Sequence, residues 1–556
     1  MAQKVIIDPI TRIEGHLRIE VELEGNTVKD AWSTITLWRG IETILKGRDP
    51  RDAGLMTQRF CGVCTYSHYE AAILAVEDAF GVKPPTNARI VRNLINASLY
   101  ITDHIMHFYH LHGLDWVDVV SALGADPRKA EDMARAYCNN PYNASASHYK
   151  AVQERLKKFV ESGRLGPFAN GYWGSPSYKL PAEANLVIVS HYLDALAVSK
   201  VGGQMMAIFG GKNPHPQTLV AGGITSVMDT MDAYRIGEYL YRLRDLKNFI
   251  DTAYIPDVLL AATYYKDEGL AGIGGGVKNY LSYGGINLDD DYTTTFFPGG
   301  VIKDRDLANV GKLDETKITE DVTHSWYQDT EPLQPYDGKT DPDYTDYDEN
   351  GHVKGDGKYS WCKAPRYDGL PYEVGPLARF IVGYAKGDQK IKDLVDATLK
   401  AAGLPVTVLF STLGRTAARA LETKLIADNT EAWINELVAN IKSGDTRTWT
   451  RCDVPDESEG RGMKEAPRGS LGHWVRIKDK VIENYQAVVP STWNCSPRDK
   501  TGVRGPYEES LIGTRLANVD QPLEIIRTIH SFDPCMACAV HIIDPRSNEI
   551  KKYKVL

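Results

Sequence analysis

The sequence of 556 residues predicts an α+β fold, with a mainly helical body built on long central helices. Three observations indicate this class. Residues 4–37 alternate between apolar and polar side chains, residues 66–260 and 376–443 carry helical periodicity, and residues 264–375 are rich in Gly, Asp, Tyr, Thr and Pro. No internal repeat is visible, so we expect one unit, although length alone is typical of about three or four domains.

The N-terminal segment, residues 1–40, predicts an antiparallel sheet. Short runs with a period of two residues occupy 5–7, 17–23 and 28–35. The sequence Glu24-Gly25-Asn26 supplies the residue types that favour a turn between the last two runs.

Helical patterns account for most of the body. The prolines at 84 and 85 separate the first helix from the second, and Thr86 or Asn87 could cap the second. The expected helices cover residues 66–80, 86–121, 126–137, 143–163, 182–209, 226–251, 376–402 and 413–443.

The remaining segments predict smaller elements. The insertion 264–375 favours short strands and ordered loops over the helical body. Strand signals return at 473–489, and a helix is expected near 506–529.

Composition excludes several protein classes. Lys plus Arg is 64 and Asp plus Glu is 73, so the net charge is −9, and a general nucleic-acid binder would need a basic face. The sequence contains no run of eighteen apolar residues, so no membrane-spanning helix is predicted. The N-terminus lacks the apolar core of a secretory signal, so any export would depend on a partner's signal.

Two Cys-x-x-Cys pairs are the main chemical signal. Cys61 and Cys64 lie near one end of the chain, and Cys535 and Cys538 lie near the other. Together they predict a four-thiolate metal site. Spacing alone leaves a structural zinc site and a catalytic metal site as equal alternatives, because several metals accept thiolates. A redox disulfide is disfavoured, since no βαβ pattern surrounds the first pair.

The other four cysteines are scattered, at positions 138, 362, 452 and 495. They do not form the compact run that an iron–sulfur cluster needs. We therefore expect no such cluster in this chain, and an electron-transfer function would require a partner that carries clusters.

His68 follows Cys64 by four residues, so on a helix both would lie on one face. It could then hydrogen-bond a thiolate and tune it. A capping or core histidine is the alternative.

A set of motifs resembles the large, catalytic subunit of [NiFe] hydrogenases, most of all the heterodimeric uptake-type branch. The resemblance covers nearly the whole chain. It is carried by Arg12-Ile-Glu14-Gly-His16, Arg39-Gly-Ile-Glu42, Arg59-x-Cys61-Gly-x-Cys64, the segments 108–116, 209–215 and 490–494, Glu465-Ala-Pro467-Arg468-Gly, and Asp533-Pro-Cys535-x-x-Cys538-x-x-His541.

The resemblance implies a nickel–iron centre. All four cysteines, Cys61, Cys64, Cys535 and Cys538, would bind nickel, and Cys64 and Cys538 would also bind iron, which carries one CO and two cyanides. A magnesium (or iron) ion would lie among Glu42, the carbonyl of Ala487 and His541.

The resemblance also implies catalytic roles in reversible, heterolytic cleavage of H2. The first proton acceptor would be the Cys535 thiolate or Arg468, and Arg468 is normally always protonated. Asp103 and Asp533 would flank Arg468, although an Asp-Pro sequence also simply starts a turn. The diatomic ligands would be held by Pro467, Arg468, Pro490 and Ser491. Glu14 would be the first proton relay, beside Cys538, its alternative being a surface glutamate.

Partners follow from the same resemblance. We expect an iron–sulfur small subunit, nickel-insertion proteins, an endopeptidase that cuts after His541, and a possible membrane cytochrome reached through the partner. Residues 1–541 would be the mature unit, with its active-site segment at 465–541, and 542–556 an extension removed on maturation. A periplasmic or membrane-associated place would depend on the partner's signal. The competing functions are a structural zinc protein and a non-catalytic, hydrogenase-like subunit of an electron-transfer complex.

Overall fold

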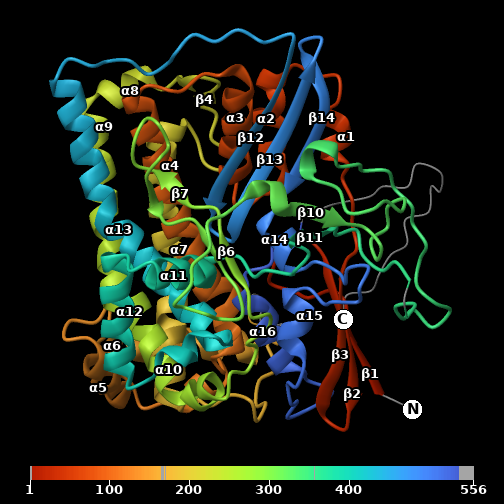
Figure 1. Cartoon of the computed structure of the whole chain (residues 1–556). Coiled ribbons are helices and arrows are strands. Elements are labelled where there is room, and N and C mark those ends of the chain that lie inside the picture. Colours follow the sequence, from red (N-terminus) through yellow and green to blue (C-terminus); the bar gives the residue numbers. More distant parts are fainter. Residues whose placement is uncertain (1–2, 164–167, 169–170, 356, 537–556) are drawn as a thin grey trace.

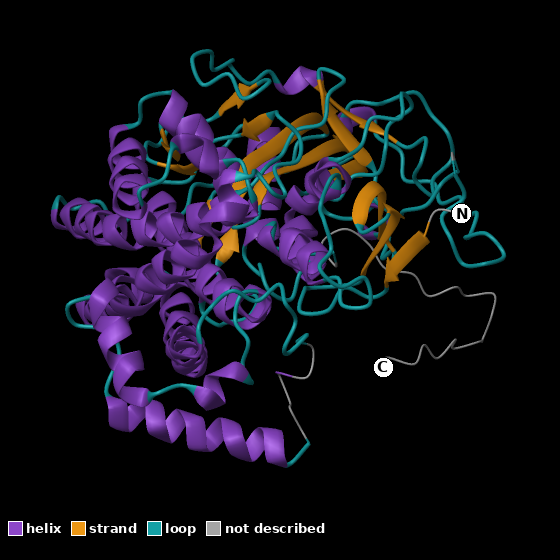
Figure 2. Cartoon of the chain, turned by 90° about the horizontal axis from the view of Figure 1, so that it is seen from below, coloured by secondary structure: helices purple, strands orange, loops and turns teal. Residues whose placement is uncertain are grey.

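A computed structural model describes residues 3–163, 168, 171–355 and 357–536. The predictions for Cys538, His541 and the extension 542–556 lie outside these residues. Helices form a large body on one side of the molecule and most strands lie on the other (Figures 1 and 2). The predicted α+β class is confirmed.

The N-terminal sheet is antiparallel, in the order β1-β2-β3, as predicted. Its strands are β1 (Gln3–Ile7), β2 (Leu17–Glu24) and β3 (Thr27–Ile35). Apolar side chains from β2 and β3 pack in one core with α15 (Pro506–Leu511) and α16 (Leu523–Ser531). The N-terminal sheet and the helices α15 and α16 therefore share a hydrophobic core.

The helical body is centred on α4 (Thr86–Met106), which packs against α7 (Ala182–Gly210) and α13 (Thr412–Lys442). Nearly every residue of α4 is buried, as expected for a helix surrounded by others. The other helices are α3 (Ser67–Phe80), α5 (Pro127–Tyr137), α6 (Ala146–Glu161), α9 (Ala233–Phe249), α10 (Ile255–Leu270), α11 (Pro376–Ala385) and α12 (Gln389–Ala402).

Three long predicted helices are interrupted. The helix expected at 86–121 leaves α-geometry after Met106 and continues as a π-turn and a 3₁₀ turn, where the Arg12 side chain donates to the Leu111 carbonyl. The helix expected at 226–251 is split, since Asp232 caps α9 after the short α8 (Val227–Met231). Gly387, with φ +75°, and the capping Asp388 separate α11 from α12.

A second antiparallel sheet lies near the C-terminus, formed by β12 (Glu457–Ala466), β13 (Gly469–Lys478) and β14 (Val481–Val488). The prediction of 473–489 found β14 and part of β13 but missed β12, whose polar sequence hides its role. A Cβ at Gly462 would lie 1.9 Å from the Ala71 carbonyl oxygen, so this glycine lets β12 pack directly on α3.

The helix expected near 506–529 is two shorter helices, α15 and α16, joined by a loop. The predicted small strands of the insertion are present as antiparallel pairs β6·β9, β7·β8 and β10·β11. Their bounds are Tyr280–Ser282, Gly285–Asn287, Thr295–Phe297, Gly300–Ile302, Ile318–Asp321 and Ala364–Tyr367. Sequence reasoning missed the short elements α1 (Ile41–Leu45), α2 (Ala53–Thr57), β4 (Leu219–Val220), β5 (Gly223–Ile224) and α14 (Pro490–Asn494).

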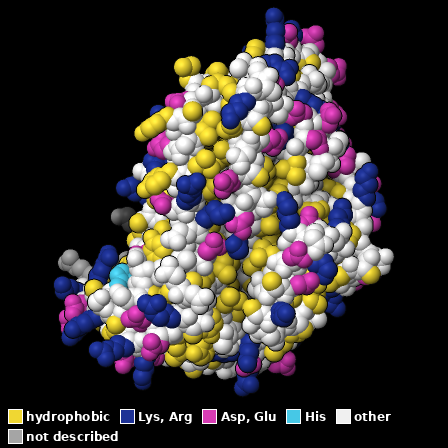
Figure 3. Space-filling view, turned by 90° about the vertical axis from the view of Figure 1, so that its left-hand side faces the viewer, with side chains coloured by type: hydrophobic (Ala, Val, Ile, Leu, Met, Phe, Trp, Pro, Cys, Tyr) yellow, Lys and Arg dark blue, Asp and Glu magenta, His cyan; other side chains and the backbone are white. Residues whose placement is uncertain are grey.

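Surface charge and one apolar helix bear on possible partners. Figure 3 shows the helical side of the molecule, where Lys and Arg are interspersed with Asp and Glu and form no basic patch. Among the described helices, α7 alone has the length and composition of a membrane span. More than half of its most apolar window, 56%, is buried inside the fold, as in the core helix of a globular protein.

Candidate metal centre

Three cysteine thiols meet in the interior, although 474 positions separate the two that approach most closely. Cys61 and Cys535 have sulfur atoms 3.1 Å apart. This separation is longer than the ~2.05 Å of a disulfide bond. With Cys64 their sulfur atoms all lie within 4.8 Å of one another, and all three residues are buried. Cys538, the fourth predicted ligand, lies outside the described residues.

The local backbone favours thiolates at this point. The amides of Val63 and Cys64 donate to the sulfur of Cys61, at 3.2 and 3.0 Å. Two N–H donors aimed at one sulfur stabilise its anionic form, which is the form that binds a metal.

Glu14 holds the segment that carries Cys535. The two residues form an isolated parallel bridge, in which the amide of Met536 donates to the Glu14 carbonyl at 2.6 Å. The Cys535 thiol donates to the Glu14 carboxylate at 3.4 Å, and the Cys535 amide donates to the Ser491 hydroxyl at 3.1 Å. Glu14 therefore contacts Cys535, and Cys538, the neighbour that the resemblance implies for it, lies outside the described residues.

Arg468 lies buried between the two predicted aspartates. Its guanidinium donates to Asp103 at 3.1 Å and to Asp533 at 2.9 Å. Burial alone would lower the pKa of Arg468, but the neighbouring anions, Asp533 first among them, raise it well above the ordinary value. Burial raises the pKa of Asp103 to about 7, although Arg468 acts in the opposite direction. A permanently charged guanidinium favours the role of Arg468 as a positioning cation over that of a base.

His68 reaches this region by a different route from the one predicted. The expected shared helical face is wrong, because α3 begins only at Ser67 and Cys64 precedes it. His68 Nδ1 instead lies 3.0 Å from Nε2 of His473 on β13. Burial lowers the pKa of His68 to about 4 against the pull of the Cys61 thiolate, and Lys464 acts in the same direction as burial.

Several of the predicted site residues border one small cavity. Its lining consists of Cys64, Ser67, His68, Ala466, Arg468, Leu471, Val489, Pro490, Ser491 and Cys535. Pro467 is not part of this lining, and its carbonyl accepts a hydrogen bond from Arg379 at 3.0 Å. Six of the residues expected to act at the centre therefore border the same space.

Comparison with known proteins is consistent with this geometry. A profile described as nickel-dependent hydrogenase matches residues 39–541, and one described as HoxL-like matches residues 4–36. The chain is 52% identical to the quinone-reactive Ni/Fe-hydrogenase large chain of Wolinella succinogenes, over 100% of this chain and 98% of that protein. It is 48% identical to the uptake hydrogenase large subunit of Rhizobium leguminosarum bv. viciae, over 100% and 97%.

The chain belongs to the nickel-dependent hydrogenase family. A solved structure agrees: the Ni-Fe-Se hydrogenase from Desulfovibrio vulgaris Hildenborough superposes with a TM-score of 0.79 at 36% identity, covering 97% of this chain and 100% of that one. The predicted hydrogenase identity and H2-directed oxidoreductase activity are thereby confirmed, and the names of the relatives imply a small-subunit partner. Neither the zinc protein nor the non-catalytic subunit finds support.

The donor set of this hydrogenase subunit fits a nickel centre. Buried thiolates are the ligands that soft and borderline transition metals select, and the three sulfur atoms are already gathered within 4.8 Å. The charged Arg468 and its two carboxylates complete a cavity with a fixed electrostatic field.

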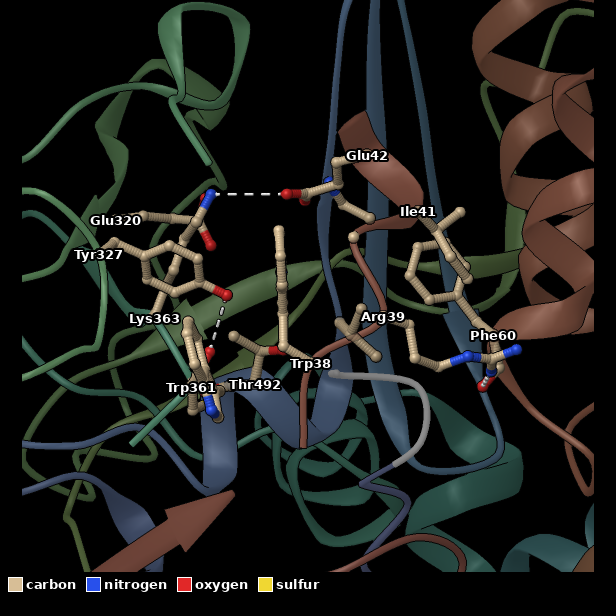
Figure 4. A pocket seen from close by; sticks show the side chains of 14 residues that line it. Trp38, Arg39, Ile41, Glu42, Phe60, Glu320, Tyr327, Trp361, Lys363 and Thr492 are labelled. Carbon is tan, nitrogen blue, oxygen red and sulfur yellow. Dashed lines mark hydrogen bonds and ion pairs between the residues drawn. The ribbon is translucent and has the colours of Figure 1, made fainter. Parts of the chain in front are cut away.

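A second polar cavity, of about 40 Å³, lies beside the first (Figure 4). Glu42 enters it from α1, accepts a hydrogen bond from the Ala487 amide at 2.9 Å, and forms an ion pair with Lys363 at 3.7 Å. Glu320 enters from β10 on the opposite side, 3.5 Å from Lys363, and burial raises its pKa to about 7. The predicted neighbours Glu42 and Ala487 are thus in contact, while His541 lies outside the described residues.

Sequence reasoning missed several residues of this second cavity. Glu320 and Lys363 belong to the loop-rich insertion, and Gln486, which accepts from Lys363 at 2.6 Å, lies on β14. No spacing pattern connects three residues that come from two separate strands and a loop, so only the structure reveals them.

Sequence reasoning also missed a buried cluster around Asp115, which connects segments leading to Glu14 and Cys535. One Asp115 oxygen lies 2.9 Å from Nδ1 of His112 and 2.7 Å from Nδ1 of His530, and the other accepts from Arg12 at 2.5 Å. His530 Nε2 in turn donates to the Thr11 carbonyl at 2.8 Å. This cluster fixes α16, which leads to Cys535, against the segment that leads to Glu14.

Proposed function

We propose that the thiolates of Cys61, Cys64 and Cys535, together with Cys538, hold a nickel–iron centre at which H2 is reversibly cleaved. The observation that carries this proposal is the approach of the Cys61 and Cys535 sulfur atoms to 3.1 Å, with the buried Arg468 bordering the same cavity as Cys535. When bound, the two metals supply the electrophile that acidifies H2, as a metal acidifies bound water.

Each residue around the cavity has a proposed task. Cys535 takes the proton, since its sulfur already lies in hydrogen-bond contact with the Glu14 carboxylate at 3.4 Å. Glu14 then carries the proton away from the centre. Arg468 stays charged and excludes water, while Asp103 and Asp533 hold its position.

The iron ligands, one CO and two cyanides, are part of the same proposal. Arg468, Pro490 and Ser491 border the cavity that would receive them, and Pro467 immediately precedes Arg468. Metal analysis of the purified complex tests the proposal: nickel with iron, and infrared bands of bound CO and cyanide, are expected. Zinc alone would refute it.

We also propose a magnesium ion among Glu42, the Ala487 carbonyl and His541. Support comes from two carboxylates, the partly buried Glu42 and the buried Glu320, which face one cavity and share a single lysine (Figure 4). Oxygen ligands of this kind suit magnesium. Glu42→Gln is expected to lower the magnesium content of the complex, and an unchanged content would contradict the assignment.

The partner is proposed to be an iron–sulfur subunit that contacts the chain near Cys61. The exposed residues Arg59 and Gly62 flank this buried cysteine, and His215 Nε2 lies 3.1 Å from its carbonyl oxygen. Gly62→Trp should block co-purification of the partner. Gly237→Trp is the matched control, because both glycines have open space around a Cβ. Normal association of the Gly62 variant would refute this placement.

Assembly and electron acceptor complete the proposal. Nickel-insertion proteins would load the centre and an endopeptidase would cut after His541. The name of the Wolinella relative, quinone-reactive, favours a quinone-linked acceptor, reached through the iron–sulfur subunit and a membrane cytochrome. Mass spectrometry of the mature subunit tests the cut, since an intact residue 556 in the nickel-loaded enzyme would exclude it.

A further inference from the structure

A buried chain of three side chains leads from the metal cavity into the C-terminal sheet. His68 on α3 lines the cavity, and its Nδ1 lies 3.0 Å from Nε2 of His473 on β13. His473 Nδ1 lies 2.6 Å from the hydroxyl of Tyr485 on β14. All three residues are at most 1% exposed. Neither His473 nor Tyr485 borders the cavity, so each would act through His68.

Each of the two contacts between these side chains is one hydrogen bond, and the donation can run in either of two directions, called here the first and the second order. In the first order the Tyr485 hydroxyl donates to His473, and His473 donates to His68. The remaining hydrogen of His68 then lies on Nε2. In the second order every donation is reversed, and Nε2 of His68 presents a lone pair.

The surroundings favour the first order for two separate reasons. The Tyr485 hydroxyl has no second hydrogen-bond partner among the described residues, so the second order would leave its buried O–H unsatisfied. The second order would also leave a lone pair on Nε2 of His68, a residue that borders the same cavity as Cys64 and Cys535. A ring N–H toward thiolates is attractive, whereas a lone pair is repelled.

The ring of His68 is held in place as well as oriented. Phe60 stacks on it with ring centroids 4.7 Å apart and an interplanar angle of 28°. With Nδ1 committed to His473, Nε2 is the only ring nitrogen left for the cavity, and it makes no hydrogen bond to any other described residue.

We propose that His473 and Tyr485 are positioning residues that fix His68 as a hydrogen-bond donor toward the thiolates of the metal centre. The inference rests on the proposed function, because the sulfurs are taken as metal ligands. A donor on a ligating sulfur withdraws electron density from the metals. The relay would therefore set the electronic state of the centre without touching substrate.

Three variants of the complete, metal-loaded complex test the relay. Tyr485→Phe removes the first donor, and His473→Leu removes the donor to His68. His473→Gln keeps an amide N–H that can reach His68 Nδ1. Tyr149→Phe is the matched control, since it removes another fully buried phenol hydroxyl, on α6. The readouts are the ¹⁵N signals of labelled histidine in a diamagnetic state and the infrared bands of CO and cyanide.

Tyr485→Phe and His473→Leu should shift the His68 signals toward a mixture of tautomers and move the CO and cyanide bands to lower wavenumber. His473→Gln and Tyr149→Phe should stay at the wild-type values. Unchanged His68 signals in both disruptive variants would overturn the assignment, as would an equal shift in the Gln and Leu variants. The nitrogen signals report whichever metal is bound, so a wild-type complex without nickel would refute the proposed function alone.

Discussion

Substitution of Asp115 by Asn should destabilise the protein more than any surface change. The carboxylate is fully buried, neutralises Arg12 at 2.5 Å, and lies within 2.9 Å of ring nitrogens of both His112 and His530. His530 also donates from Nε2 to the Thr11 carbonyl, so the side chains of His530 and Arg12 are both held by buried hydrogen bonds around Asp115. Removing one partner of a buried ion pair costs about 3–5 kcal/mol.

Urea unfolding of the wild type and the variant measures this loss. Asp291→Asn is the control, because the Asp291–Lys83 pair is exposed and such pairs contribute about 0–1 kcal/mol. A loss of less than about 1 kcal/mol in Asp115→Asn would refute the reasoning, because it would mean that Arg12 and His530 do not depend on this carboxylate. A shift of the Cys535 segment should accompany the loss, and nickel retention after dialysis would report it.

Three further predictions concern proton transfer through Glu14, the packing of β12 on α3, and the pH dependence of stability. Glu14→Gln should keep nickel and iron but abolish exchange between H2 and D2O, and normal exchange would contradict the relay. Gly462→Ala should lower stability by about 1–3 kcal/mol, since a Cβ meets the Ala71 carbonyl at 1.9 Å, whereas Gly237→Ala should not, which thermal unfolding can compare. Burial lowers the pKa of His191, but Asp257 outweighs it and raises the pKa above the ordinary value. The stabilisation by this pair is therefore complete below about pH 6.5 and lost as the pH rises through the folded pKa. His191→Gln should flatten the pH dependence of unfolding, and an unchanged slope would refute it.

The sequence predicted the architecture wherever a local period decides the structure. The N-terminal strands and most of the central helices follow from side-chain alternation and helical periodicity. The interruption after Met106 could not be predicted, because residues 107–112 contain no proline or glycine, and the Arg12 side chain that contacts the Leu111 carbonyl is 99 positions away in the sequence. The strand β12 was missed because glycine and charged residues let it pack against a helix rather than into an apolar core.

The site divides in the same way. Motifs identified the cysteines and Arg468, whose roles depend on residue type and short spacing. Contacts between distant segments were not predictable: the partner of His68 is His473, and Glu14 meets Cys535. Glu320 and Lys363 had no signal at all, because Glu320 lies on a four-residue strand and Lys363 in a loop, and neither is long enough for a period to be recognised.

The bridge between Glu14 and Cys535 joins positions 521 apart, so it has a consequence for biosynthesis. A nascent chain that has been synthesised only as far as α13 contains two of the site cysteines, Cys61 and Cys64. It lacks the later residues that line the cavity, such as Arg468 and Cys535. Such an incomplete ligand set would bind a metal ion only weakly. Specific binding of a metal by three thiolates is therefore expected only after the segment that carries Cys535 has been synthesised and has packed beside Glu14.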